Sequence, residues 1–260
     1  MPVAAGIYYH QYLDEQEPNL PVVLLHGAGG MHLSWPPEVR RMKGAQVYAL
    51  DLPGHGRSDQ SGGLQDISNH ARAVVEWVHA INLPAAVFVG HSMGGAIALT
   101  LALDFSEHVA GLGLVATAAN LPVNPALLDD AFHPTTFQKA VANIVKWSFS
   151  SQASERLVEL VYQRMLETRP SVLHSDLRAC DRFDVRERVK TIDKPAVIIC
   201  GSDDRMAPLR NSQFLSLTIP RSSFKVINGA GHMVMLEQPA VVAQSLVEFI
   251  HSLAFYPGVA

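Results

Sequence analysis

Ser92 lies at the centre of the pattern with the clearest chemical meaning, the G-H-S-M-G sequence at 90–94. An apolar run at 86–89 precedes it and a helix-forming run at 96–103 follows it, which predicts a strand, a sharp turn and a helix. A serine at such a turn needs small neighbours two positions away on each side, and the two glycines meet this need. The helix dipole would favour a negative charge beside the serine. A tight connection or a phosphate-binding loop uses similar glycines, but the flanking strand and helix favour a nucleophile.

A nucleophilic serine needs two further side chains. Its hydroxyl is a weak nucleophile near neutral pH, so a histidine must act as base and a carboxylate must orient that histidine. In doubly wound sheets such groups lie on loops beyond the carboxyl ends of strands. One such loop follows the apolar run 196–200 and holds Asp203 and Asp204, and another follows the run 223–227 and ends in His232. These side chains are the candidates for the acid and the base.

The apolar pattern predicts the elements that must hold these groups. Continuous apolar runs indicate parallel strands covered by helices on both faces, and they lie at 21–25, 46–50, 86–89, 111–116 and 196–200. Helices are predicted near 35–42, 66–81 and 239–253, and an edge strand at 7–13. The sequence therefore predicts the α/β class: a doubly wound, mostly parallel sheet formed by residues 1–117 and 191–260, with a helical cap inserted at 118–190.

Five loops carry motifs that occur together in one family. The run His26-Gly27-Ala28-Gly29 resembles an HGxG oxyanion loop, and residues 51–58 resemble a DxxGxGxS loop. Residues 90–94 resemble a nucleophile elbow, 201–208 a G-x-x-D-x-x-x-P acid loop, and 231–232 the base loop. In this order, and over nearly the whole chain, they resemble an α/β-hydrolase-fold enzyme of the esterase and lipase-like group with a small helical cap.

The resemblance implies a role for particular residues. Ser92 would be the nucleophile, His232 the base and Asp204 the acid, with Asp203 as the fallback for the acid. The backbone N–H groups of Ala28 and Met93 would form the oxyanion hole. No cofactor is implied.

Composition excludes several classes of partner. The chain of 260 residues has 17% charged residues and a formal net charge of -4, and no run of Lys and Arg exceeds two residues, so neither nucleic acid nor an anionic membrane is an expected partner. No apolar stretch reaches the roughly 20 residues of a membrane span.

The first residues lack the basic and apolar regions of a secretory signal, so a cytoplasmic protein is expected. Cys180 and Cys200 are expected to be structural, and oligomeric state is not predicted.

Twelve histidines raise the alternative of a metal centre. They show neither HExxH nor another close ligand spacing, so hydrogen bonding in loops is the simpler interpretation and no metal is expected. Glu237 is expected to cap or orient the last helix. Arg178, Arg182 and Arg186 are candidates for a positive charge over the pocket.

The predicted function is hydrolysis of small-molecule carboxylic esters, with a preference for short chains, through an acyl-enzyme. Met31, Leu33 and Trp35 follow the oxyanion loop and favour a closed apolar pocket. Ser92 argues against the dehalogenases and epoxide hydrolases of this fold, which have an aspartate at that position. Three alternatives stay open: a thioesterase, a carbon–carbon bond hydrolase acting on anionic ring-fission products, and a non-catalytic ligand receptor.

Overall fold

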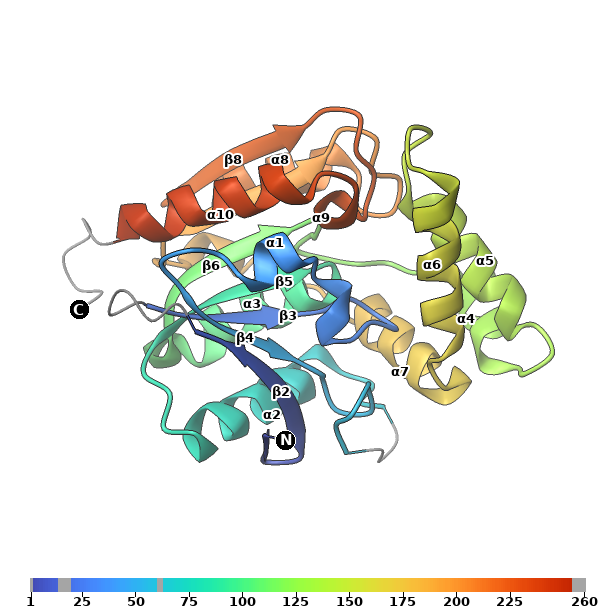
Figure 1. Cartoon of the computed structure of the whole chain (residues 1–260), viewed down its shortest axis with the longest axis horizontal. Coiled ribbons are helices and arrows are strands. Elements are labelled where there is room, and N and C mark those ends of the chain that lie inside the picture. The colour runs from blue at the N-terminus through green and yellow to red at the C-terminus, as the bar shows by residue number, and fades with distance from the viewer. Residues whose placement is uncertain (1, 14–19, 60–62, 254–260) are drawn as a thin grey trace.

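The structure is a computed structural model that describes residues 2–13, 20–59 and 63–253. The described residues form one sheet of eight strands in the order β1-β2-β4-β3-β5-β6-β7-β8 (Figure 1). β1 and β2 pair antiparallel, β2 joins β4 antiparallel, and the remaining neighbours are parallel. The strands are β1 Val3–Ala4, β2 Ile7–Tyr12, β3 Pro21–Leu25, β4 Gln46–Leu50, β5 Ala86–His91, β6 Val109–Val115, β7 Ala196–Gly201 and β8 Ser222–Ile227. The predicted doubly wound, mostly parallel sheet is confirmed.

The apolar run of β3 explains why the sheet lies between two layers of helices. Successive side chains of a strand point to opposite faces. Val23 and Leu25 accordingly pack into one hydrophobic cluster, while Val22 and Leu24 pack into the other. Each face therefore needs its own cover of helices.

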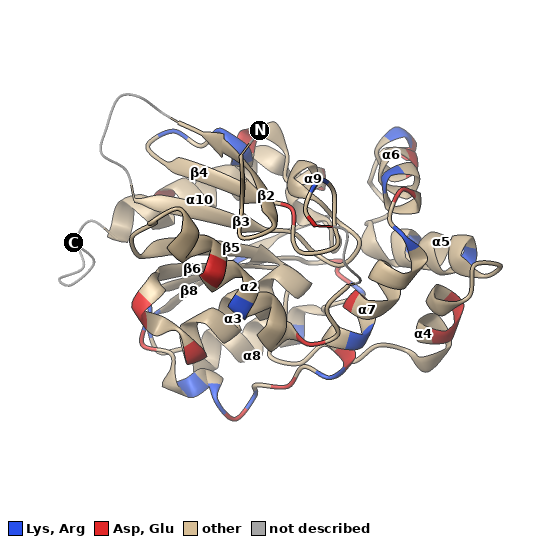
Figure 2. Cartoon of the chain, turned by 90° about the horizontal axis from the view of Figure 1, so that it is seen from below, with Lys and Arg blue, Asp and Glu red and all other residues tan. Residues whose placement is uncertain are grey.

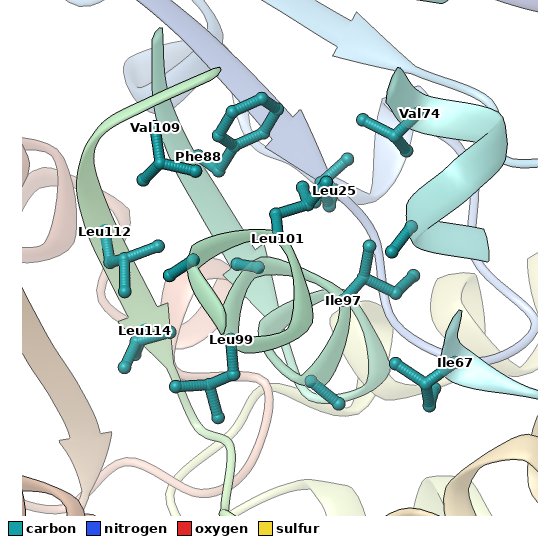
Figure 3. Packing of buried hydrophobic residues seen from close by; sticks show 14 of the residues in the cluster. Leu25, Ile67, Val74, Phe88, Ile97, Leu99, Leu101, Val109, Leu112 and Leu114 are labelled. Atoms are coloured by element: carbon teal, nitrogen blue, oxygen red, sulfur yellow. The ribbon is translucent and has the colours of Figure 1, made fainter. Parts of the chain in front are cut away.

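Helices α2 (Ile67–Ala80), α3 (Met93–Asp104) and α8 (Leu209–Thr218) cover one face, and α1 (Pro37–Arg40), α9 (Val234–Glu237) and α10 (Pro239–Leu253) cover the other. Figure 3 shows α3 surrounded by apolar side chains from the sheet and from α2. Residues 93–102 of α3 are buried on every side, as expected of a helix that is apolar all round. The helix that follows Ser92 is thus fixed rigidly in the core.

Four helices are inserted between β6 and β7, and we call them the insertion: α4 Pro125–Phe132, α5 Phe137–Ser148, α6 Glu155–Leu166 and α7 Pro170–Asp181. They lie to one side of the sheet (Figure 1) and have a hydrophobic cluster of their own. α7 also packs on the body, because Ala179 and Cys180 belong to the cluster beneath the sheet. The division of the chain at 117/118 and 190/191 stays a prediction.

The structure differs from the expected elements in two local features. The edge strand predicted at 7–13 is β2, but β1 pairs outside it. The helix predicted near 35–42 is shorter, since α1 covers only Pro37–Arg40, and a 3₁₀ turn at His32–Ser34, before the predicted range, is divided from it. Pro36 and Pro37 explain the division, because proline cannot continue a helix but suits its first position.

Acidic and basic residues are interspersed over the helices and loops in Figure 2. In the described part of the chain, no helix is long and apolar enough to cross a membrane. Both cysteines are buried and carry free thiols.

Candidate active site

The backbone of Ser92 has the strained conformation expected at a nucleophile elbow. Its φ of 52° and ψ of -114° are unfavourable for a residue with a side chain. The surroundings hold it there: its N–H donates to the Val115 carbonyl (3.0 Å), and the Thr117 hydroxyl donates to its carbonyl (2.7 Å). The Ser92 side chain borders a cavity at the carboxyl edge of the sheet.

Gly90 and Gly94 are required by close backbone contacts. A Cβ at Gly90 would overlap the carbonyl of Gly94, and a Cβ at Gly94 would overlap the carbonyl of Leu25 at the end of β3. Neither contact can be relieved by turning a side chain. The elbow therefore fits against the loop after β3 only because both residues lack a side chain.

We expect Gly94→Ala to lower the free energy of unfolding by about 3 kcal/mol, because backbone must move to accept the methyl group. Gly111→Ala in β6 is the matched control, since the two atoms nearest its Cβ would be the side-chain ends of Leu253 and Phe249 at 3.1 and 3.2 Å, and the Pro195 carbonyl would lie at an ordinary contact distance of 3.4 Å. Urea unfolding of both variants measures the difference. Equal losses in the two variants would contradict the close contact at the elbow.

His232 lies on the loop after β8 and borders the same cavity as Ser92. Its Nδ1 lies 2.9 Å from Oδ2 of Asp204, which is on the loop after β7. The other carboxylate oxygen, Oδ1, accepts the N–H groups of Met206 and Ala207, both at 2.8 Å. Since a carboxylate only accepts, Nδ1 of His232 carries the hydrogen and Nε2 is left with a lone pair. That arrangement suits a general base.

Asp203 has a different environment. It is exposed, and its Oδ1 accepts the hydroxyl of Ser202 at 2.7 Å. Asp204 is 5% exposed and in contact with His232. The geometry therefore favours Asp204, the residue that fills the motif, over the fallback.

The loop after β3 is fixed by the hydrogen bonds of a buried histidine. His26 is fully buried, and burial and then the neighbouring His55 lower its pKa to about 3, so the ring is neutral. Its Nε2 accepts the Leu52 N–H (3.0 Å), which leaves Nδ1–H to donate to the Gly27 carbonyl (2.8 Å). Because a trans peptide is planar, the Ala28 N–H points opposite to that carbonyl.

Ala28 borders the cavity, and Met93 is the first residue of α3, directly after Ser92. The first N–H groups of a helix have no partner within it. Among the described residues, neither the Ala28 nor the Met93 N–H donates to a protein acceptor. One unpaired donor therefore follows Ser92 directly and another lies on a loop that borders the same cavity, and an oxyanion site requires donors of this kind.

The cavity has a volume of about 250 Å³ and a mostly apolar wall. Leu33 and the insertion side chains Ile144, Leu157 and Val161 contribute to it. Sulfur is unusually frequent in this wall, which includes Met31, Met165, Met206, Met233 and Met235. Trp35 instead packs in the core. Among the described residues there is no group of three or more side chains that could hold a metal ion.

Comparison with known proteins agrees with this geometry. Residues 21–239 match the model of the alpha/beta hydrolase fold family. The chain belongs to this family. It is 28% identical to 3-oxoadipate enol-lactonase 1 of Acinetobacter baylyi over 90% of each chain. It is also 28% identical to a 2-hydroxy-6-oxononadienedioate/2-hydroxy-6-oxononatrienedioate hydrolase of Paraburkholderia phymatum, over 88% of this chain and 86% of that protein.

Among solved structures, a thermophilic esterase is similar to this α/β hydrolase, with 30% identity, a TM-score of 0.80, and coverage of 95% of this chain and 98% of the other. The relatives cleave different bonds by their names. Family membership therefore supports hydrolase activity and leaves the substrate open.

One expectation about the hydrolase is wrong. Arg178, Arg182 and Arg186 do not border the cavity; Arg182 pairs with Asp66 (3.6 Å) and Arg186 with Asp184 (2.6 Å). Arg178 lies on α7 and the other two follow that helix, and the sequence alone could not show which side chains face the cavity. Arg164 on α6 does lie in the cavity wall, and it pairs with Glu167 at 3.2 Å.

Glu237 also differs from its expected role at the last helix. Its Oε1 accepts the Gly231 N–H (2.8 Å) and its Oε2 accepts the Ser150 N–H (3.1 Å). It therefore fixes the loop that carries His232 and joins that loop to the end of α5. Sequence reasoning missed this role, because Ser150 is 87 residues away and no local motif marks the contact.

Proposed function

We propose that the protein is a serine hydrolase that cleaves small carboxylic esters through an acyl-enzyme. The observation that carries this proposal is that Ser92 and His232 border one apolar cavity, and that Asp204 binds Nδ1 of His232. Asp204 holds His232 in the tautomer whose Nε2 accepts a proton, and that proton comes from the Ser92 hydroxyl.

The reaction then proceeds in two halves. Ser92 Oγ bonds to the ester carbonyl carbon, its proton moves to His232, and the carbonyl electron pair becomes an oxyanion bound by the N–H groups of Ala28 and Met93. The oxyanion collapses, the carbon–oxygen bond to the alcohol breaks, and His232 protonates the departing alcohol. A water molecule then gives its proton to His232 and attacks the acyl-enzyme, which releases the acid and restores Ser92. These steps use no cofactor and no metal.

The size and polarity of the cavity favour a small, uncharged acyl group. Its volume of about 250 Å³ lies below the roughly 300–1,000 Å³ typical of small-molecule sites. Among the described residues, Arg164 is the one Lys, Arg, Asp or Glu in the wall, and it is already paired with Glu167. The arginines that would have favoured an anionic ring-fission substrate lie elsewhere, so a neutral ester is the better fit.

We expect p-nitrophenyl esters from acetate to palmitate to be hydrolysed fastest at short chains, because a long acyl chain exceeds the cavity. The measurement is kcat/KM across the series, with Ser92→Ala as background. Faster turnover of palmitate than of butyrate would contradict the small pocket. Inactivity on every ester, together with covalent labelling by a fluorophosphonate, would shift the assignment to thioester or carbon–carbon cleavage. Absence of both would favour a non-catalytic receptor.

A further inference from the structure

A fully buried carboxylate of the insertion binds the loop that carries Ala28. Asp176 on α7 is 0% exposed, and its Oδ2 accepts the Gly29 N–H at 2.8 Å. The same oxygen lies 2.8 Å from Nε2 of His55, on the loop after β4. Asp176 is 147 residues from Gly29 in the chain, so this contact joins the insertion to the body beside the proposed oxyanion donor.

His55 is held as a cation by its two partners. Its Nδ1 lies 3.1 Å from the Pro53 carbonyl and its Nε2 lies against the Asp176 carboxylate. Both partners only accept, so both ring nitrogens carry hydrogen. Burial opposes this charge, but the Asp176 carboxylate outweighs burial and raises the pKa of His55 above its usual value. His55 and Asp176 therefore form a buried ion pair.

Two further contacts hold the loop of residues 26–30. The Thr168 hydroxyl, just before α7, donates to the Gly29 carbonyl at 2.9 Å, so both polar backbone groups of Gly29 are bound by the insertion. The His55 ring packs edge-on against His26, with centroids 4.7 Å apart. His26 in turn holds the Gly27 carbonyl, which sets the direction of the Ala28 N–H.

We propose that Asp176 is a positioning residue that fixes the loop of residues 26–30 from the insertion, so that the Ala28 N–H is held in place for the oxyanion. This inference rests on the function proposed above. A buried ion pair is an inefficient means of stabilising a fold, since both charges must leave water. Oxyanion stabilisation depends on preorganised donors. A gain in the rate of the reaction therefore offsets the cost of removing these two charges from water.

Among the titratable groups around the ion pair, His55 is the one that we expect to lose its charge first as pH rises. Burial lowers the pKa of His26 to about 3 and that of His70, on α2, to about 4. Burial raises the pKa of the Cys180 thiol, to which Asp176 and Asp181 add. Asp51 has a lowered pKa and stays charged; burial opposes its charge, but its hydrogen bonds to His32 outweigh this. Since the pKa of His55 is raised, the ion pair is intact below that pKa and is lost as pH rises through it.

The test is Asp176→Asn, which keeps the shape of the side chain and one acceptor but removes the charge. We expect kcat for the best short-chain ester to fall roughly 10- to 100-fold, less than the loss of a whole oxyanion donor, with KM changed by less than about threefold. The affinity of a trifluoromethyl ketone, whose adduct places an oxyanion in the site, should fall in proportion to kcat/KM. Without the carboxylate, His55 loses its proton at lower pH, so the alkaline fall in kcat should begin at lower pH than in the wild type.

Asp184→Asn is the matched control, because it removes an exposed carboxylate that pairs with Arg186 after α7. We expect this variant to match the wild type in kcat and in ketone affinity. A folded Asp176→Asn protein that also matches the wild type in both, and in its alkaline limb, would overturn the proposal. An equal loss in both variants would overturn it as well, since it would reflect a general effect of removing charge near α7.

If Asp176→Asn does not fold, Thr168→Val tests the same coupling by removing only the hydrogen bond to the Gly29 carbonyl. A fall of a few fold in kcat and in ketone affinity would support the proposal, and unchanged values would overturn it. The wild type separates this inference from the proposed function. A wild type that neither hydrolyses esters nor reacts with a fluorophosphonate refutes the function, whereas an active wild type with unaffected variants refutes only the role of Asp176.

Discussion

Replacement of Ser92 by alanine is expected to lower kcat/KM for short-chain esters by about 10⁴-fold or more, leaving only the rate from the oxyanion donors and substrate binding. The strained backbone at Ser92 presents its hydroxyl at the cavity, so the variant loses the atom that forms the acyl-enzyme. Steady-state hydrolysis of p-nitrophenyl butyrate measures the loss. Circular dichroism should show an intact fold, because the change removes one oxygen.

Ser148→Ala is the matched control for this result. Ser148 borders the same cavity, but its hydroxyl donates to the Ile144 carbonyl at 2.7 Å within α5. We expect its activity to stay within about threefold of the wild type, as for a change that leaves the reacting groups in place. Similar losses in Ser92→Ala and Ser148→Ala would contradict the assignment of the nucleophile.

Asp204→Asn is expected to lower kcat by about 10⁴-fold with little change in KM. The two N–H donors of Met206 and Ala207 hold the Oδ1 atom of Asp204. In the variant they would hold the amide oxygen and turn the NH₂ group toward His232. Since an NH₂ group donates, it would favour the tautomer of His232 that has its hydrogen on Nε2 and cannot accept the serine proton.

Asp203→Asn provides the comparison for that variant, because the two aspartates are adjacent and carry the same charge. Asp203 is exposed and bonded to Ser202. We expect its kcat to stay within about twofold of the wild type, as for other surface substitutions. A larger loss from Asp203→Asn than from Asp204→Asn would show that the wrong aspartate has been paired with His232.

The parts of the molecule that the sequence predicted well are those with local signals. Strand β4 and helix α10 have the predicted bounds, because an apolar run marks the strand and Pro239 marks the start of the helix. The elbow was recognisable because neighbouring backbone leaves no room for a side chain at Gly90 or Gly94, so both positions must be glycine. Asp204 could be preferred to Asp203 only through its place in a motif, and its contact with His232 required the fold.

The parts that the sequence could not predict depend on how the insertion lies on the body. Asp176 and Glu237 act through partners that are 147 and 87 residues away, and neither lies in a recognised motif. The sequence offered Arg178, Arg182 and Arg186 as a positive charge over the pocket, but it could not show which of their side chains face the cavity. His55, between two glycines in the DxxGxGxS loop, was the available signal for a buried partner such as Asp176.

The central claim is that Ser92 is the nucleophile, and peptide mapping by mass spectrometry after reaction with a fluorophosphonate tests it most directly. We expect one phosphonyl group per chain, located on Ser92, absent from Ser92→Ala and formed much more slowly in Asp204→Asn. A phosphonyl group on another residue of the wild type, or unchanged labelling of Ser92→Ala, would contradict it.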